Sequence, residues 1–182
     1  MGSEKHLLKY HKNSQQKRTY DLLREVCDST FLSIRQDQVP SSEKDFKVIV
    51  DQNKYKGPFN GILSAHEAHP EVAWLVLACD LPFLNKESIK TLVTQRNPDK
   101  SATCMTSKTF NIPEPLITIW EPKGLESAKV YLQTKVNSGP KEFLLNSDIA
   151  QVYPMSDEVL FNANSQEDFE QAKNRLSKLQ HG

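Results

Sequence analysis

Asp80 is the residue of this sequence with the clearest capacity for chemistry. It follows the apolar run of residues 74–79 (WLVLAC), and Pro82, two positions later, cannot extend a strand. Six apolar residues in a row are typical of a strand that is buried on both faces inside a parallel sheet. Ligands of open α/β sheets bind along the edge where such strands end, and a carboxylate there suits Mg²⁺. A turn aspartate without chemistry fits the same pattern about equally well.

Two more features are expected at that edge of the sheet. Asp51 follows the run of residues 46–50 (FKVIV), and Gly57, Pro58 and Gly61 open a predicted helix. The glycines would let backbone approach a ligand, and the helix N-terminus favours an anion or the polar edge of a base. The alternatives are a strand-end turn residue for Asp51 and an ordinary tight turn at Gly57.

Three polar residues each have a functional and a structural interpretation. Lys5 could neutralise phosphate, or it could be a solvated lysine of a polar segment. Asn162 and Asn164 alternate along an extended segment, so both can point to one face and bind a heterocycle or phosphate. Turn formation and capping before Ser165 would explain the same two residues.

The cysteines and histidines do not suggest a metal centre or a nucleophile. Cys27, Cys79 and Cys104 lie in apolar contexts without a CxxC pair, which indicates reduced, buried thiols of a cytoplasmic protein. No histidine or cation flanks them, so a catalytic cysteine is disfavoured. His66 and His69 lack a third ligand and are predicted to be surface residues, not zinc ligands.

Composition limits the partners. The chain has 182 residues, with 23 Lys+Arg balanced by 23 Asp+Glu. It is predicted to form a single domain over residues 1–182. The balanced charge gives no electrostatic field that would attract nucleic acid. No apolar run approaches the ~20 residues of a membrane span. No signal peptide is recognisable, so we expect a cytoplasmic protein that binds neither nucleic acid nor membrane.

The elements that must position these residues alternate along the chain. Apolar spacing and capping residues predict helices and strands in an order typical of a three-layer α/β domain. The helices are expected from residue 14, from 57, at 85–95, 125–136, 141–144 and from 165 to about 179; the strands at 30–34, 46–50, 74–79, 102–105, 115–120, 150–153 and 159–161. The first element is a helix, whereas doubly wound sheets normally start with a strand and a phosphate-binding turn.

Taken in order, several motifs resemble those of the molybdenum cofactor guanylyltransferases, nucleotidyltransferases with a Rossmann-like fold. Residues 78–83 (ACDLPF) match the CDxPF element, and Asp51 with residues 57–65 (GPFNGILSA) is similar to D…GPLAGILSA. Residues 1–10 (MGSEKHLLKY) resemble the tail of the opening motif LxAGGxSxRMGxDKxLLxY. The other matches are residues 114–120 (EPLITIW) with PxPLxAxY, 141–144 (KEFL) with RxFL, and 161–169 (FNANSQEDF) with NxNTPEDL.

The resemblance implies transfer of GMP from GTP to molybdopterin or Mo-molybdopterin, with release of pyrophosphate. Asp80 would be catalytic and hold Mg²⁺, and Lys5 would be catalytic by neutralising the triphosphate. The residues implied to border the nucleotide are Lys5, Arg35, Asp51, Gly57, Gly61 and Asp80. Those implied on the pterin side are Lys141, Asn162 and Asn164. Other proteins of molybdenum cofactor biosynthesis are candidate partners.

Two departures from the family pattern matter. Glu4 replaces the usual Asp, and the LxAGGxSxR portion is absent because Met1 coincides with the Met of RMGxDK. The resemblance therefore implies a three-layer α/β/α Rossmann-like nucleotidyltransferase fold with a mostly parallel sheet whose first, central strand is missing. Its loss would expose ladder groups on two neighbouring strands, open a gap in the core and leave the chain marginally stable and with little activity.

Two alternatives stay open. One is a cytidylyltransferase, or another nucleotidyltransferase of the same superfamily, which a nucleotide competition assay would separate. The other is a non-catalytic relic that binds a partner or a pterin.

Overall fold

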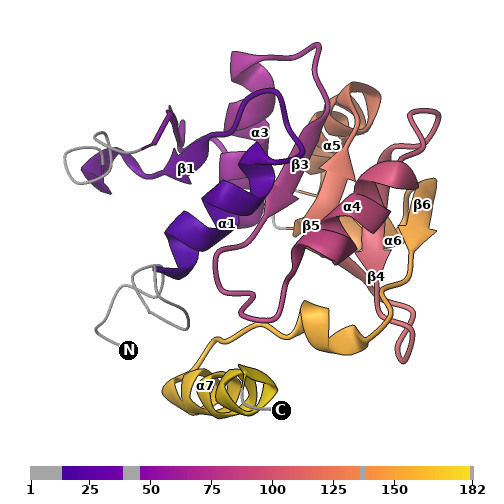
Figure 1. The fold of residues 1–182 in the computed structure, drawn as a ribbon. Coiled ribbons are helices and arrows are strands. Elements are labelled where there is room, and N and C mark those ends of the chain that lie inside the picture. Colours follow the sequence, from indigo (N-terminus) through magenta and orange to yellow (C-terminus); the bar gives the residue numbers. More distant parts are fainter. Residues whose placement is uncertain (1–13, 39–45, 136–137, 181–182) are drawn as a thin grey trace.

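The structure is a computed structural model that describes residues 14–38, 46–135 and 138–180. The strands in these residues form two separate sheets (Figure 1). In the first sheet β1 (Leu32–Ile34) pairs in parallel with β2 (Val48–Val50). The second sheet has the order β3-β5-β4-β6. Its strands are β3 (Trp74–Leu77), β4 (Ala102–Thr106), β5 (Pro113–Trp120) and β6 (Ile149–Val152).

The direction of β5 differs from the parallel arrangement expected of the sheet. β4 and β6 pair in parallel, but β5 runs antiparallel to both β3 and β4. The reason is the short connection from β4 to β5, because a tight hairpin can only join antiparallel strands. Ser107 N–H donates to the Ile112 carbonyl across this hairpin (3.0 Å). The other three strands of this sheet, β3, β4 and β6, do run in one direction.

The prediction that residues 74–79 form a strand buried on both faces within a parallel sheet is wrong. All four residues of β3 are only half-buried, and within the described residues β3 pairs with β5 alone. Its other edge faces β1 across a cavity, so solvent reaches side chains that a neighbouring strand would cover.

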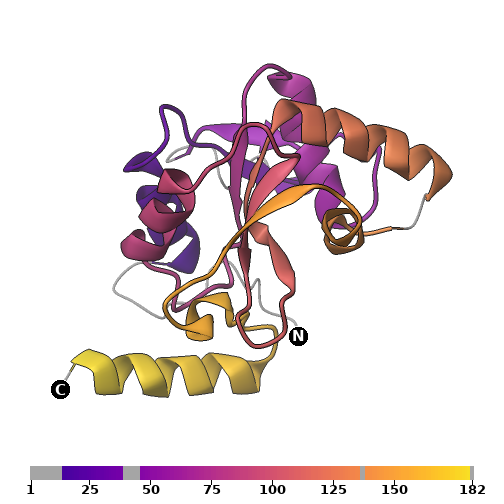
Figure 2. The ribbon, with the colours of Figure 1, turned by 90° about the vertical axis from the view of Figure 1, so that its right-hand side faces the viewer.

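Helices cover both faces of the sheets, which gives the expected three layers (Figure 2). α1 (Gln15–Arg24) and α4 (Lys86–Thr94) lie on one face, and their apolar residues join a core with Met105, Ile117 and Ile119. α3 (Pro58–Ala68), α5 (Pro122–Thr134) and α6 (Pro140–Leu145) lie on the other face, around Trp120. None of the described helices is long and apolar enough to cross a membrane.

Local capping signals place several helix starts where the sequence predicts them. Ser14 Oγ accepts from Lys17 N–H at α1, and Asn85 Oδ1 accepts from Ser88 N–H at α4. At α7 (Gln166–Gln180), Ser165 and Asp168 form the reciprocal capping box: Asp168 N–H donates to Ser165 Oγ and Ser165 N–H to Asp168 Oδ2.

Two local predictions are wrong. The strand expected at residues 159–161 is instead a 3₁₀ turn, η3 (Asp157–Leu160), which begins where Ser156 Oγ accepts from Glu158 N–H. His66, predicted at the surface, is 1% exposed, with Nε2 2.8 Å from Glu126 Oε1. It is buried because α5 packs against α3, a contact that helical spacing alone does not reveal. His69 is exposed, as predicted.

Candidate active site

A cavity of about 400 Å³ lies where β2 and β3 end, and we call it the edge cavity. Asp51, Gly57, Gly61 and Asp80 all line it. These residues come from the ends of two strands that belong to different sheets and from the start of α3. The structure therefore brings together four of the residues that the sequence predicts at one edge.

Neighbouring side chains hold the carboxylate of Asp51. Ser33 Oγ donates to Asp51 Oδ1 (2.7 Å), and Asn60 Nδ2 donates to Asp51 Oδ2 (3.3 Å). The backbone N–H of Asp51 donates to the Ile34 carbonyl (2.8 Å), which continues the β1–β2 ladder. The carboxylate is thus oriented before any ligand binds. Sequence reasoning missed Ser33 and Asn60, because they meet Asp51 only when β1 and α3 pack beside it, and the sequence does not show that packing.

The two glycines serve different purposes. Gly57 is the N-cap of α3 with φ +59°, a backbone conformation that favours glycine, and a Cβ there would meet open space. Gly61 was expected to admit a ligand, but a Cβ there would lie 2.6 Å from Ser33 Oγ. Gly61 is therefore needed so that α3 can approach the Ser33–Asp51 hydrogen bond.

Gly61→Ala is expected to destabilise the protein by about 1–2 kcal/mol, because the added methyl must displace Ser33 Oγ from Asp51. Urea unfolding followed by circular dichroism measures the change in free energy. In a Ser33→Ala background the same substitution should cost clearly less, because the hydroxyl has been removed. Equal costs in both backgrounds would contradict this account of Gly61.

On the other side of Asp80 lies Glu114, which sequence reasoning did not assign to the site. The β3–β5 register pairs Leu77 with Ile117, and Ala78 N–H donates to the Leu116 carbonyl (3.0 Å). Asp80 follows in the turn after β3, close enough for its charge to act on Glu114 of β5. Burial raises the pKa of the Glu114 carboxyl, and the charge of Asp80 raises it further, while the Leu116 N–H and Lys141 lower it. The sequence could have pointed to Glu114 only if the antiparallel direction of β5 had been known.

The three residues predicted on the pterin side, Lys141, Asn162 and Asn164, have different surroundings. Ala163 N–H donates to the Asp80 carbonyl (2.9 Å), which brings Asn162 close to the end of β3. Asn162 Oδ1 is buried and has no hydrogen-bond partner among the described residues. Lys141 is an exposed residue of α6 whose charge acts on Glu114. Asn164 is exposed, and its backbone N–H donates to Asp168 Oδ2 (3.0 Å) at the start of α7.

Arg35 and Lys5 were also predicted to border the nucleotide. Arg35 follows β1 at the same edge, but its exposed side chain pairs with Asp37 (Nε–Oδ1, 3.2 Å) and does not line the cavity. Lys5 lies outside the described residues. The roles of both residues stay predictions.

Cys104 is buried, whereas Cys27 and Cys79 are half-buried, and burial raises the pKa values of all three thiols. Burial, with a further contribution from Asp80, raises the pKa of Cys79 from 9.0 to about 11. Burial raises the pKa of Cys104 from 9.0 to about 12. Because the thiolate is the nucleophile, neither side chain is prepared for covalent catalysis near neutral pH.

Cys79 and Cys104 are therefore expected to react with iodoacetamide at pH 8 at least about tenfold more slowly in the folded protein than in urea. Both pKa values are raised by folding, so these thiols stabilise the fold below pH 9 and that contribution is lost as pH rises toward about 11–12. Mass spectrometry of labelled peptides measures the rates. Equal labelling in both states would contradict the burial of these thiols.

The donor set beside Asp80 fits a hard divalent cation. Asp80, Glu114 and Asn162 offer carboxylate and amide oxygens, which Mg²⁺ prefers. Within the described residues no group of three or more His, Cys, Asp or Glu could hold a metal ion. One or two carboxylates can hold Mg²⁺ when waters and substrate phosphates supply the other oxygens.

Comparison with known proteins adds a family assignment. The family model described as "MobA-like NTP transferase domain" matches residues 1–169. A "molybdenum cofactor biosynthesis bifunctional protein" of Synechocystis sp. is 33% identical over 176 residues, 94% of this chain and 49% of that protein. A "molybdenum cofactor guanylyltransferase" of Shewanella sp. is 23% identical over 133 residues, 72% of this chain and 67% of that protein. The chain thus spans about half the length of the first of these relatives.

Solved structures share the fold. Molybdopterin-guanine dinucleotide biosynthesis protein A from Archaeoglobus fulgidus aligns with a TM-score of 0.77 at 19% identity, covering 97% of this chain and 92% of that chain. A 2-C-methyl-D-erythritol 4-phosphate cytidylyltransferase from Thermus thermophilus aligns with a TM-score of 0.66 at 14% identity, covering 96% and 94%. At these identities the likeness concerns the fold alone.

Proposed function

The chain belongs to the family of MobA-like NTP transferase domains, and from this premise we propose that it acts in transfer of GMP from GTP to molybdopterin, forming the guanine dinucleotide cofactor. Its relatives' names refer to molybdenum cofactor biosynthesis and to guanylyl transfer. GTP, a molybdopterin acceptor and Mg²⁺ are the small molecules that this proposal requires.

The position of Asp80 is the observation that carries the proposal. On one side, Asp80 lines the edge cavity together with Asp51 and Gly57. On the other side it meets Glu114 and the backbone of Ala163. A residue between two polar regions suits a reaction that joins a nucleotide to a second phosphorylated substrate. We assign the edge cavity to the nucleotide and the side of Glu114, Lys141 and Asn162 to the acceptor.

In the proposed reaction an oxygen of the acceptor's terminal phosphate attacks the α-phosphorus of GTP. The bond from that phosphorus to the bridging oxygen breaks, and pyrophosphate leaves. Catalysis of this kind depends on positioning and on neutralising charge. When bound, Mg²⁺ would neutralise phosphate charge, and Asp80 would hold it. The N-terminus of α3 at Gly57 favours an anionic or polar nucleotide group, and Lys141 offers a cation to the acceptor.

A nucleotide panel tests the proposal. The chain is incubated with molybdopterin, MgCl₂ and one of GTP, CTP, ATP or UTP. We expect the guanine dinucleotide and pyrophosphate from GTP, and protection against thermal unfolding by GTP above the other nucleotides.

The other outcomes identify the alternatives. Product from CTP in preference to GTP would make the protein a cytidylyltransferase. No product from any nucleotide, with retained binding of molybdopterin or a nucleotide, would support a non-catalytic binding domain. Neither binding nor product would reject both proposals.

A further inference from the structure

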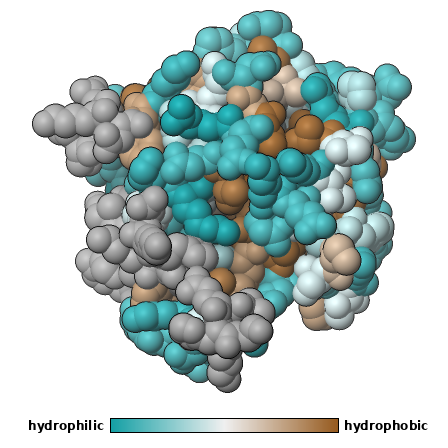
Figure 3. All heavy atoms as spheres, in the orientation of Figure 1, coloured by the Kyte–Doolittle hydropathy of each residue, from teal (hydrophilic) through white to brown (hydrophobic). Residues whose placement is uncertain are grey.

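The face of α1 that packs against the core is apolar toward its end but polar at its start. Leu22 and Val26 pack against the core on this side of the sheet. One and two turns earlier the same face carries Arg18 and Gln15, because residues three and four apart share one side of a helix. Gln15 is 0% exposed and Arg18 is half-buried. Figure 3 shows hydrophobic atoms recessed among hydrophilic ones on the side of the molecule where α1 lies, and these two residues depart from that separation.

The two polar side chains hold the turn that follows Asp80. Gln15 Nε2 donates to the Leu81 carbonyl (3.0 Å), and Arg18 Nη2 donates to the Leu84 carbonyl (2.6 Å). The N–H of Leu84 also donates to the Leu81 carbonyl (3.3 Å), which closes the turn. All four residues of the turn, 81–84, are buried. The backbone directly after Asp80 is therefore fixed to the first turns of α1.

Gln15 and Arg18 are costly residues at positions that face the core. Within the described residues no carboxylate pairs with Arg18, and burial lowers the pKa of its guanidinium. Gln15 Oε1 and Arg18 Nη1 are buried without a hydrogen-bond partner among these residues. Buried polar atoms without partners cost free energy that apolar side chains would not cost. Residues that lower stability in this way are typical of functional sites.

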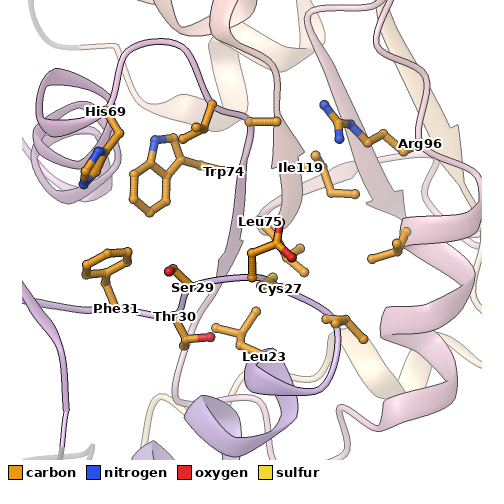
Figure 4. A pocket seen from close by; sticks show the side chains of 15 residues that line it. Leu23, Cys27, Ser29, Thr30, Phe31, His69, Trp74, Leu75, Arg96 and Ile119 are labelled. Atoms are coloured by element: carbon orange, nitrogen blue, oxygen red, sulfur yellow. The ribbon is translucent and has the colours of Figure 1, made fainter.

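A second face of α1 lies against the space assigned to the nucleotide. Gln16, Thr19 and Tyr20 line the edge cavity. Leu23 lines it as well and points toward a further cavity of about 440 Å³ between β1 and β3 (Figure 4). One helix thus contacts the nucleotide space with one face and the turn after Asp80 with another. The position of the Asp80 carboxylate relative to a nucleotide therefore depends on how α1 holds that turn.

We propose that Gln15 and Arg18 are positioning residues for Asp80. By holding residues 81–84 against α1, they keep the Asp80 carboxylate at the edge cavity, in the place where it would hold Mg²⁺ beside the nucleotide. Neither residue is among those that line this cavity in the described structure, so both act through Asp80. This inference rests on the proposed function.

Substitution by methionine, which retains an unbranched side chain without the donors, tests the proposal. We expect Arg18→Met and Gln15→Met each to lower the kcat of pyrophosphate release at least about tenfold, because misplacing a catalytic group by about 1 Å costs up to about 100-fold. The KM for GTP should stay within about threefold of the parent value, since the edge cavity is unchanged. Arg18→Lys keeps a charged donor and should recover part of the lost rate.

Arg24→Met is the matched control, because Arg24 is an exposed residue of the same helix. It should leave kcat unchanged. Urea unfolding separates positioning from a merely structural role. Methionine suits a face that packs against the core, so the Met variants at Gln15 and Arg18 should unfold at urea concentrations no lower than the parent. An unchanged kcat in both of these variants, or an equal loss in Arg24→Met, would overturn the proposal.

Metal binding gives a readout that does not depend on transfer. Mn²⁺, which prefers the same oxygen ligands as Mg²⁺, is titrated in the presence of GTP and followed by electron paramagnetic resonance. We expect Arg18→Met and Asp80→Asn to weaken Mn²⁺ binding at least about fivefold, as misplacing or removing a ligand should, and Arg24→Met to leave it unchanged. Undiminished Mn²⁺ binding by Arg18→Met and Gln15→Met would also overturn the proposal.

The two measurements distinguish this proposal from the proposed function. The expected Mn²⁺ pattern in a chain that forms no product from GTP would reject guanylyl transfer and retain the positioning role. Transfer by the parent, with unchanged kcat in both Met variants, would do the reverse. A parent chain that neither binds Mn²⁺ nor transfers GMP would reject both.

Discussion

Asp80→Asn is expected to lower the rate of pyrophosphate release during the proposed transfer of GMP by at least about 100-fold. The substitution removes the charge that we assign to holding Mg²⁺, while it preserves the side-chain shape and the backbone carbonyl that accepts from Ala163. Charge stabilisation by a metal contributes several kcal/mol to such a transition state, and about 1.4 kcal/mol is a factor of ten.

Asp148→Asn is the matched control for this experiment. Asp148 carries the same side chain, is 72% exposed and pairs with Lys100 at the start of β4, away from the edge cavity. It should leave the rate unchanged. A rate for Asp80→Asn within about threefold of the parent would remove the metal role from this residue.

Gly124→Ala is expected to destabilise the fold by about 3 kcal/mol or more, since overpacking against backbone has no easy relief. A Cβ at this position would lie 1.9 Å from the carbonyl oxygen of Ser101. Ser101 cannot move aside freely, because its N–H donates to the Asp148 carbonyl (2.9 Å) and its carbonyl accepts from Glu121 N–H (3.1 Å). Such a loss is a large part of a typical net stability of about 5–15 kcal/mol.

Gly139→Ala is the matched control, because a Cβ there meets no heavy atom within 4 Å and its φ of −90° suits alanine. Urea unfolding by circular dichroism compares the two variants with the parent chain. We expect the parent and Gly139→Ala to unfold at similar urea concentrations and Gly124→Ala to unfold at a clearly lower one. Coincident transitions for the two variants would show that α5 can shift without cost.

Local signals in the sequence predict most of the elements. The predicted caps are present at Ser14, at Asn85 and at Ser165 with Asp168, because a cap depends only on the next three residues. The apolar runs ending at Asp51 and Asp80 form strands at the predicted places. The error at residues 159–161 arises because an apolar run this short fits a 3₁₀ turn as well as a strand.

Neighbours distant in the chain account for what the sequence did not predict. The burial of His66 depends on Glu126 and α5, and the direction of β5 depends on its hairpin with β4. For the same reason Glu114 escaped assignment: its charge interaction with Asp80 arises because β5 packs beside β3. Periodicity predicts that a residue lies in a strand and on which face, but it does not predict which other strand pairs with that strand.

The sequence by itself determined the order of helices and strands and put Asp51, Gly57 and Asp80 at the ends or starts of elements, since those properties follow from neighbouring residues. Only the tertiary structure decided that these residues share one cavity, that Ser33 and Asn60 orient Asp51, and that β1 and β3 face each other across a cavity. Strand order and close side-chain contacts depend on how distant segments pack, and residues that are neighbours in the sequence do not reveal that packing.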